Sequence, residues 1–263
     1  MISKRHKAFK MNTLKNRILA AACLGFLAVN LASSARADIN LVLNGDFETT
    51  THGGGQLGYN TQAAFWTTGG YNFLFTPGSA DSTGVTGSDG NLKLWGPSDG
   101  SANGLPSTSP SGGNYVAADG AYEVGAISQT VSNLFVGNTY SLSFYWAGAQ
   151  QSGFSGTNTE AWQVSLGTET YTTDIATNVS HGFTGWVQQT FNFTATATNE
   201  VLSFLARGTP PGVPPFSVLD GVSMTQVTSP TPAPEPSTLQ YGAVALLFVC
   251  AGARKMFRRK TQA

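Results

Sequence analysis

Alternation of apolar and polar residues recurs along the second half of this chain and restricts its fold more than any other feature. In Tyr140–Trp146, every second residue is apolar or aromatic, and the residues between them are mainly serine. A period of two places neighbouring side chains on opposite faces of a strand, so each such segment predicts a strand with one buried face. Strand-like segments of this kind are Ile39–Phe47, Tyr140–Trp146, Trp162–Leu166, Val187–Ala195, Val201–Ala206 and Val218–Val227. No window has the 3.6-residue period of an amphipathic helix, so we expect an all-β fold, an antiparallel β-sandwich.

Residues 52–113 have a different composition, rich in glycine, serine, threonine and asparagine. Three aromatic islands interrupt it, at Phe65-Trp66, Tyr71–Phe75 and Leu92–Trp95. We interpret this stretch as short strands joined by long loops. Because loops on a rigid scaffold often carry binding residues, we expect a binding site here.

The first 37 residues have the parts of a secretory signal peptide. Six basic residues between Lys4 and Arg17 precede the apolar stretch Ile18–Ala32, and Ala35-Arg36-Ala37 fits the small-x-small cleavage rule. We therefore predict that a signal peptidase cleaves after Ala37. A first transmembrane helix is the alternative, but the apolar core is short for one.

The C-terminal end combines a Pro-rich segment, an apolar run and a basic cluster. Proline cannot continue a helix or a central strand, so the segment around Pro234, Glu235 and Pro236 is expected to be extended and accessible. The apolar run Leu239–Ala253 can enter a bilayer, although a full span takes roughly 20 residues. We divide the chain into a signal peptide (1–37), a β-sandwich domain (38–229), a Pro-rich stalk (230–237) and a single apolar helix with a basic tail (238–263).

The order of these three C-terminal features resembles the PEP-CTERM sorting signal of Gram-negative bacteria. The residues that carry the resemblance are Pro234, Glu235, Pro236, the run Leu239–Ala253 and the Arg/Lys cluster after it. The resemblance implies recognition by an exosortase, a membrane-embedded sorting protease, after transient anchoring of the helix in the inner membrane. It further implies export to the cell surface, outer membrane or extracellular matrix, commonly alongside exopolysaccharide. An ordinary tail anchor on a Pro-rich stalk is the alternative.

The formal net charge of zero conceals a strong segregation of charge. Of the 14 Lys and Arg residues, seven lie at or before Arg36 and five at or after Arg254, which leaves Lys93 and Arg207. Thirteen of the 14 acidic residues lie in 38–229, so that domain carries a charge near −11. This charge excludes the basic footprint of nucleic-acid binding and disfavours docking on anionic lipid. It favours attraction of cations.

Motifs in the predicted domain also resemble galactose-binding-like jelly rolls, the group that holds many carbohydrate-binding modules. The opening motif is Asn40–Glu48 and the closing motif is Leu219–Ser223. Between them, Ile127–Val131 leads through a turn at Gly137 to Tyr140–Trp146, and Trp186 precedes Phe191–Thr194. The resemblance implies a jelly roll in which the first and last strands lie together.

In that family a structural calcium ion often lies between the first and last strands. Glu48 matches the acidic residue after the opening phenylalanine, and Asp220 matches the acid of the closing motif. Carboxylate oxygens are ligands that Ca²⁺ prefers. The family often has two adjacent acids where this chain has Asp220-Gly221, which removes one ligand. The alternative is that Glu48 and Asp220 cap turns or accept hydrogen bonds from backbone amides.

Trp66, Tyr71 and Trp95 are the candidate carbohydrate-binding residues. Flat aromatic rings pack against the C–H faces of sugars, and neighbouring polar groups bind the hydroxyls. All three rings lie in residues 52–113, whereas we expect the tryptophans at 146, 162 and 186 to build the core. For each of the three candidates, burial in the core is the alternative.

No catalytic set stands out. The domain has two histidines, His52 and His181, but neither a Gly-x-Ser-x-Gly elbow nor a His-Glu-x-x-His motif. Carboxylate pairs for glycoside hydrolysis could come from Asp119, Glu123, Glu160 or Glu169, but such acids at Gly/Ala-rich strand ends are typical turn formers. We therefore expect a non-catalytic carbohydrate-binding or adhesion module associated with exopolysaccharide or biofilm. A structural matrix protein without specific glycan binding is the alternative, and a secreted hydrolase has the least support.

Overall fold

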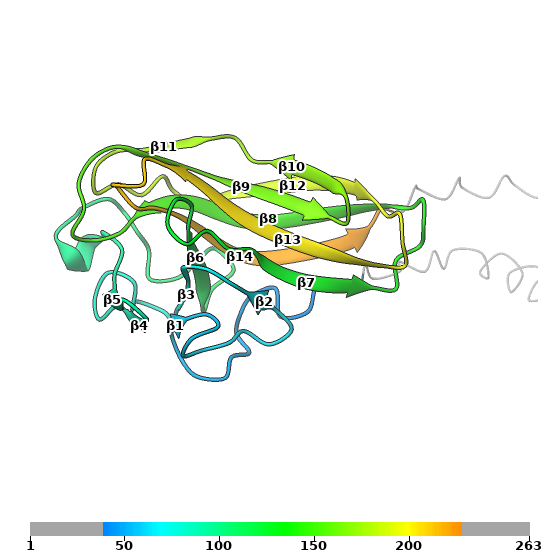
Figure 1. Cartoon of the computed structure of the whole chain (residues 1–263), viewed down its shortest axis with the longest axis horizontal. Coiled ribbons are helices and arrows are strands. Elements are labelled where there is room, and N and C mark those ends of the chain that lie inside the picture. The colour runs from blue at the N-terminus through cyan, green and yellow to red at the C-terminus, as the bar shows by residue number, and fades with distance from the viewer. Residues whose placement is uncertain (1–38, 228–263) are drawn as a thin grey trace, which may run out of the picture. The chain divides into compact units, whose positions relative to one another are not determined.

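The computed structural model describes residues 39–227, which form antiparallel sheets (Figure 1). The predicted all-β antiparallel sandwich is confirmed. In this part of the chain, the helical structure is one 3₁₀ turn, η1 (Pro97–Asp99), and no helix has the length and apolar character of a membrane span. The predicted signal peptide with its cleavage at Ala37, the Pro234–Pro236 motif and the C-terminal apolar helix lie outside the described residues.

Two sheets of six strands stack on each other, with a short hairpin beside them. The first sheet has the order β1 (Gly55–Gln56), β3 (Asn72–Phe75), β6 (Tyr115–Asp119), β14 (Pro215–Gln226), β8 (Thr139–Gln150), β12 (Val187–Thr194). The second has the order β10 (Glu169–Thr172), β9 (Asn158–Leu166), β13 (Asn199–Thr209), β7 (Ile127–Ser132), β2 (Thr67–Thr68), and β11 (Ala176–Asn178) also pairs with β9. The hairpin consists of β4 (Val85–Gly87) and β5 (Gly90–Leu92). In Figure 1 the long strands β8, β9, β13 and β14 run side by side, and β1 to β5 gather below them.

The main core fills the space between the two sheets. It is built by the apolar positions of the alternating segments, because these all point to one face of their strand. Phe144 of β8, Trp162 of β9 and Phe204 of β13 are fully buried, and the ring of Phe204 meets the other two edge-on at 5.1 and 5.9 Å. The sequence pattern therefore specifies both the strands and their inner face.

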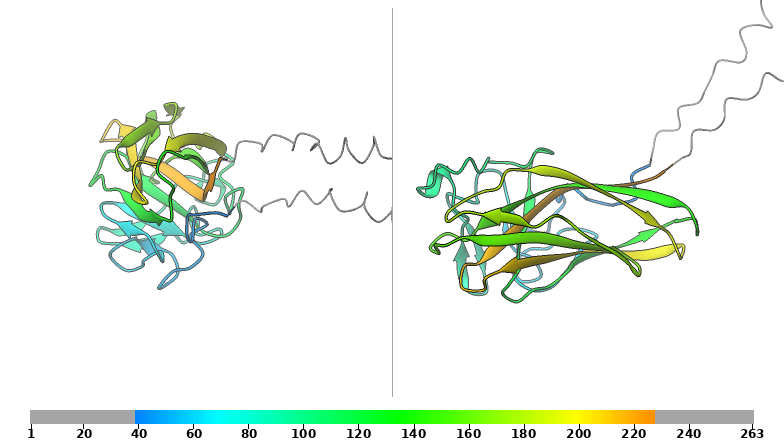
Figure 2. Two further views of the ribbon diagram at one scale, coloured as in Figure 1. Left: turned by 90° about the vertical axis from the view of Figure 1, so that its right-hand side faces the viewer. Right: turned by 90° about the horizontal axis from the view of Figure 1, so that it is seen from above.

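A second core covers part of the outer face of the first sheet. Phe73 of β3, Tyr115 of β6 and Phe216 of β14 lie on this outer face. Apolar residues of the segment 76–114, among them Leu92 and Leu94, bury them. The left view of Figure 2 shows the cyan part of the chain on one side of the long strands. Residues 76–114 are thus a third layer, packed on the sheet, and not a set of free loops.

The prediction of a strand at Ile39–Phe47 was wrong, because this segment forms no regular strand. Asn44 and Phe47 have positive φ angles of 50° and 54°, which interrupt an extended backbone. The segment nevertheless lies beside β14: the backbone N–H of Leu41 donates to the carbonyl of Met224 over 2.8 Å. The beginning and the end of the described chain are therefore adjacent, as the jelly-roll resemblance implied.

Candidate functional site

Two of the three predicted sugar-binding rings are buried. Trp66 is 3% exposed and packs in the main core, where its indole N–H donates to the carbonyl of Asn44 over 2.9 Å. Tyr71 is 6% exposed and packs edge-on against Phe73 in the second core. Their ring faces are used for packing, so the prediction of a shared sugar platform was wrong for these two residues.

Trp95 is the candidate that remains partly exposed. It lies between β5 and η1, where its backbone N–H donates to the carbonyl of Gln150 at the end of β8 over 2.9 Å. Its indole N–H donates to the carbonyl of Phe154 over 2.8 Å. Asn103 donates from its side-chain amide to the carbonyl of Trp95 over 2.8 Å. The backbone of Trp95 is therefore held by Gln150 and Asn103, and its ring is held by Phe154.

His181 lies against Trp95 and completes an aromatic pair. The ring centroids are 4.0 Å apart and the planes differ by 29°. His181 has a positive φ of 61°, and the side-chain oxygen of Gln150 accepts a hydrogen bond from its backbone N–H over 2.6 Å. These contacts hold a non-glycine residue in a left-handed conformation that would otherwise be unfavourable.

Polar side chains surround this Trp95–His181 pair. The hydroxyl of Ser155 lies 2.7 Å from His181 Nε2, and the hydroxyl of Ser101 donates to the His181 carbonyl over 2.7 Å. The backbone carbonyl of Phe154 accepts the hydrogen bond of the Trp95 indole, and the Phe154 side chain is 39% exposed. We call Trp95, Phe154, His181, Ser101 and Ser155 the Trp95 site. Its chemistry combines flat apolar rings with neutral hydrogen-bonding groups, the combination that binds a sugar.

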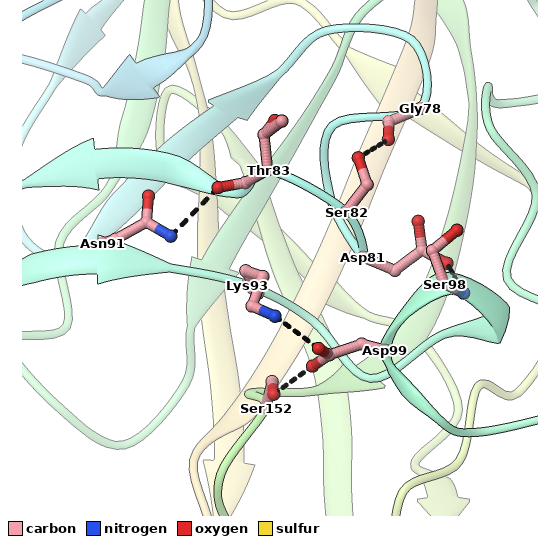
Figure 3. Close-up of polar contacts among 9 residues, drawn as sticks. All are labelled: Gly78, Asp81, Ser82, Thr83, Asn91, Lys93, Ser98, Asp99 and Ser152. Carbon is pink, nitrogen blue, oxygen red and sulfur yellow. Dashed lines mark hydrogen bonds and ion pairs between the residues drawn. The ribbon is translucent and has the colours of Figure 1, made fainter.

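A partly buried ion pair supports the segment that carries Trp95. Lys93 forms an ion pair with Asp99 of η1, and Ser152 donates a hydrogen bond to the same carboxylate (Figure 3). Burial alone would raise the pKa of Asp99, but the hydrogen bonds from Lys93 and Ser152 and the charge of Lys93 lower it. The carboxylate therefore stays ionised and joins β5, η1 and the end of β8 next to the Trp95 site.

The two predicted calcium ligands, Glu48 and Asp220, each contact one end of the loop 109–114. A carboxylate oxygen of Glu48 accepts a hydrogen bond from the backbone N–H of Asn114 over 2.6 Å. Asp220 accepts a hydrogen bond from the hydroxyl of Ser109. Within residues 39–227 no three His, Cys, Asp or Glu side chains meet as a metal-binding group, so a calcium ion here would need carbonyl or hydroxyl oxygens as well.

Asp220 nevertheless has a buried carboxylate oxygen that lacks a hydrogen-bond partner. It is fully buried at a bulge of β14, and its Oδ1 has no hydrogen-bond partner. Burial raises the pKa of Asp220 to about 7, although hydrogen bonds from Ser109, Gly221 and Ser111 act in the opposite direction. A cation beside Oδ1 would remove the cost of burying this carboxylate in its charged form. The predicted calcium ion fits the unpartnered oxygen and stays a prediction.

No local sequence pattern indicates the partners of Trp95. His181 was recognised only as one of two histidines, and nothing local indicates that it lies against a ring 86 positions earlier. Phe154 and Ser155 were not predicted at all. Their convergence depends on the turn after β8 and on the segment after β11, whose conformations are set by tertiary contacts such as the one between His181 and Gln150.

Comparison with known proteins gives structural likenesses only. No protein-family model and no curated protein matches the chain. Among solved structures, TmCBM61 in complex with beta-1,4-galactotriose aligns with 72% of this chain and 99% of its own, at 16% identity and a TM-score of 0.38. The K3 adhesin domain of Lys-gingipain from Porphyromonas gingivalis aligns with 72% and 96%, at 15% identity and a TM-score of 0.38. The CBM22-1 xylan-binding domain of Paenibacillus barcinonensis Xyn10C aligns with 74% and 99%, at 13% identity and a TM-score of 0.36. At TM-scores below 0.5 these likenesses do not identify a ligand for this chain.

Proposed function

We propose that this chain is a non-catalytic carbohydrate-binding protein whose glycan contact is the Trp95 site. The observation that carries the proposal is the Trp95–His181 pair: a partly exposed indole held rigidly at 4.0 Å from an imidazole, with hydroxyl groups beside it. A rigid ring loses little conformational entropy when a sugar packs on it. The nearby serine hydroxyls can exchange hydrogen bonds with sugar hydroxyls.

The proposal includes a galactose-binding-like jelly roll and a cell-surface location. Support for the topology comes from the adjacency of the first described segment and β14, and support for the location comes from the PEP-CTERM-like tail with Pro234, Glu235 and Pro236. In this proposal an exosortase processes the tail, and the domain engages exopolysaccharide outside the cell. A calcium ion held by Glu48 and Asp220 would neutralise the buried charge of Asp220 and fix the loop that joins them.

A polysaccharide retention assay tests the proposed site. The full-length chain is kept in a polyoxyethylene detergent, because a detergent with a sugar head group would compete for the site. Neutral polysaccharides in a native gel should slow the wild-type chain, and Trp95→Ala should abolish the retardation. The control is Phe135→Ala, which removes a ring that is 65% exposed in the turn between β7 and β8. Equal retention of wild type and Trp95→Ala would exclude the Trp95 site. Absence of binding to every glycan in an array would favour the structural-matrix alternative.

A further inference from the structure

A second group of aromatic and acidic side chains lies at the turn after β6 and shares no residue with the Trp95 site. Tyr122 is 46% exposed there, and its ring meets that of buried Tyr71 edge-on, with centroids 5.2 Å apart. The hydroxyl of Tyr122 donates a hydrogen bond to Asp89 Oδ2 over 3.2 Å. Asp89 comes from the turn of the β4–β5 hairpin, so two separate segments build this group.

Three acidic residues lie around the two tyrosines: Asp89 accepts the hydrogen bond of Tyr122, the backbone carbonyl of Glu123 accepts a hydrogen bond from the N–H of Tyr71 over 2.9 Å, and the charge of Asp119 acts on Tyr71. Asp89 and Glu123 are exposed, whereas Asp119 at the end of β6 is 1% exposed. Asp119 Oδ1 accepts hydrogen bonds from the backbone N–H groups of Ala121 and Tyr122 over 2.7 and 3.0 Å, but its Oδ2 has no partner. The buried Oδ2 of Asp119 therefore lacks a donor.

No positive side chain in the described part of the chain neutralises this group. Among residues 39–227 the only ion pair is between Lys93 and Asp99. The other cation there, Arg207, donates two hydrogen bonds to the side chain of Gln163, over 3.1 and 2.9 Å. The negative charge of Asp89, Asp119 and Glu123 therefore remains uncompensated.

The tyrosine hydroxyls respond to this negative charge. Burial, followed by the charges of Asp89, Asp119 and Glu123, raises the pKa of Tyr71 to about 12. The hydrogen bond to Asp89 and the charges of Asp89 and Glu123 raise the pKa of Tyr122 as well. The carboxylate charges that oppose loss of the phenolic proton also favour a bound cation, whereas burial does not.

We propose that Tyr122, Asp89 and Glu123 bind the ammonium group of an amino sugar in a de-N-acetylated glycan. An ammonium group has three donors, which two carboxylates can accept, and the face of Tyr122 offers a cation–π contact. The same ring face can pack against the sugar. An ammonium fits better than a metal ion, because no three acidic side chains within residues 39–227 meet at metal-binding distances. This inference rests on the proposed function, because it assumes that the ligand is a glycan. It assigns that glycan to a second site, separate from the Trp95 site.

Titration calorimetry with glucosamine oligomers tests the inference on the full-length chain in the same detergent. We expect binding of the glucosamine hexamer at low salt, loss of this binding at high salt, and no comparable binding of the N-acetylglucosamine hexamer. Asp89→Asn and Glu123→Gln should each weaken binding of the glucosamine hexamer about tenfold, as expected for loss of a charge-assisted hydrogen bond. Both side chains are exposed, so the fold should tolerate the changes. Asp174→Asn removes another exposed carboxylate and is the matched control.

Two further measurements separate this site from the Trp95 site and from a peptide site. In a chain that already carries Trp95→Ala, Asp89→Asn and Glu123→Gln should still weaken binding of the glucosamine hexamer. If Trp95→Ala abolishes that binding while Asp89→Asn and Glu123→Gln do not, the second site is refuted and glycan binding at Trp95 stands. Binding of oligolysine without binding of the glucosamine hexamer would also overturn the inference, because the partner would then be a basic peptide. Equal binding of the acetylated and deacetylated hexamers would show that the ammonium group is not recognised.

Discussion

The buried carboxyl group of Asp220 makes the stability of the domain depend on pH in a way that can be calculated. Its folded pKa of about 7 compares with about 3.9 in an unfolded chain. Because the folded pKa is raised, the favourable contribution of the neutral form is fully present below about pH 4 and is lost as the pH rises through about 7. Each pH unit between the two pKa values changes the free energy of unfolding by about 1.4 kcal/mol. Between about pH 5 and about pH 8, ionisation of Asp220 alone should lower the free energy of unfolding by about 2 to 3 kcal/mol.

Asp220→Asn isolates this contribution. The amide has nearly the same shape but stays neutral. Between these pH values, the free energy of unfolding of the variant should therefore fall by about 2 to 3 kcal/mol less than that of wild type. The measurement is urea unfolding followed by tryptophan fluorescence at both pH values, in the presence of a chelator. The buried carboxyl groups of Asp119 and Glu160 are present in both proteins, so their contributions cancel. Asp174→Asn, at an exposed position, should follow wild type. Identical pH dependence of wild type and Asp220→Asn would refute the reasoning.

Calcium added to the same experiment tests the ligand role of Glu48 and Asp220. A bound Ca²⁺ would favour the charged form of Asp220, so excess calcium should restore stability to wild type at the higher pH and leave Asp220→Asn unchanged. Glu48→Gln should weaken the effect. If calcium and chelator give the same unfolding midpoint for wild type, the predicted calcium site is excluded.

Three other substitutions test the packing and the interior charge. Phe204→Ala, in the centre of the main core, should lower the free energy of unfolding by about 3 to 5 kcal/mol in urea; a loss under about 1 kcal/mol would show that the site collapses freely. Gly45→Ala should lower the melting temperature, because its Cβ would overlap the backbone carbonyl of Val222, and an unchanged melting temperature would contradict this contact. Burial raises the pKa of Glu160 to about 8, so Glu160→Gln should flatten the fall in stability between about pH 6 and about pH 9, and an unaltered pH profile would argue against it.

The alternation pattern predicted the long strands because their packing repeats with the backbone geometry. Phe144, Trp162 and Phe204 could be assigned to an inner face from the sequence alone. The same reasoning failed at Ile39–Phe47, where Asn44 and Phe47 adopt positive φ angles that no apolar pattern reveals.

The candidate site was predictable only in part. Trp66, Tyr71 and Trp95 look alike in sequence, since each is an aromatic residue in a loop-rich stretch. Their fates differ because Trp66 packs in the main core, whereas residues 76–114 fold back on the first sheet and bury Tyr71 in the second core. Trp95 stays partly exposed and packs on His181, a contact between segments that join only in the folded state.

The position of β14 has a consequence for how the protein is made. It is the last strand of the described chain, yet it lies in the middle of the first sheet, between β6 and β8. Until residues 215–226 are available, β6 and β8 have no shared neighbour, and the sheet cannot close. Folding dominated by such distant pairings is slow, so the growing chain should remain unfolded through most of its synthesis. A chain truncated before Pro215 should therefore show no cooperative unfolding, and a chain that crosses a membrane before it folds would gain its structure on the far side.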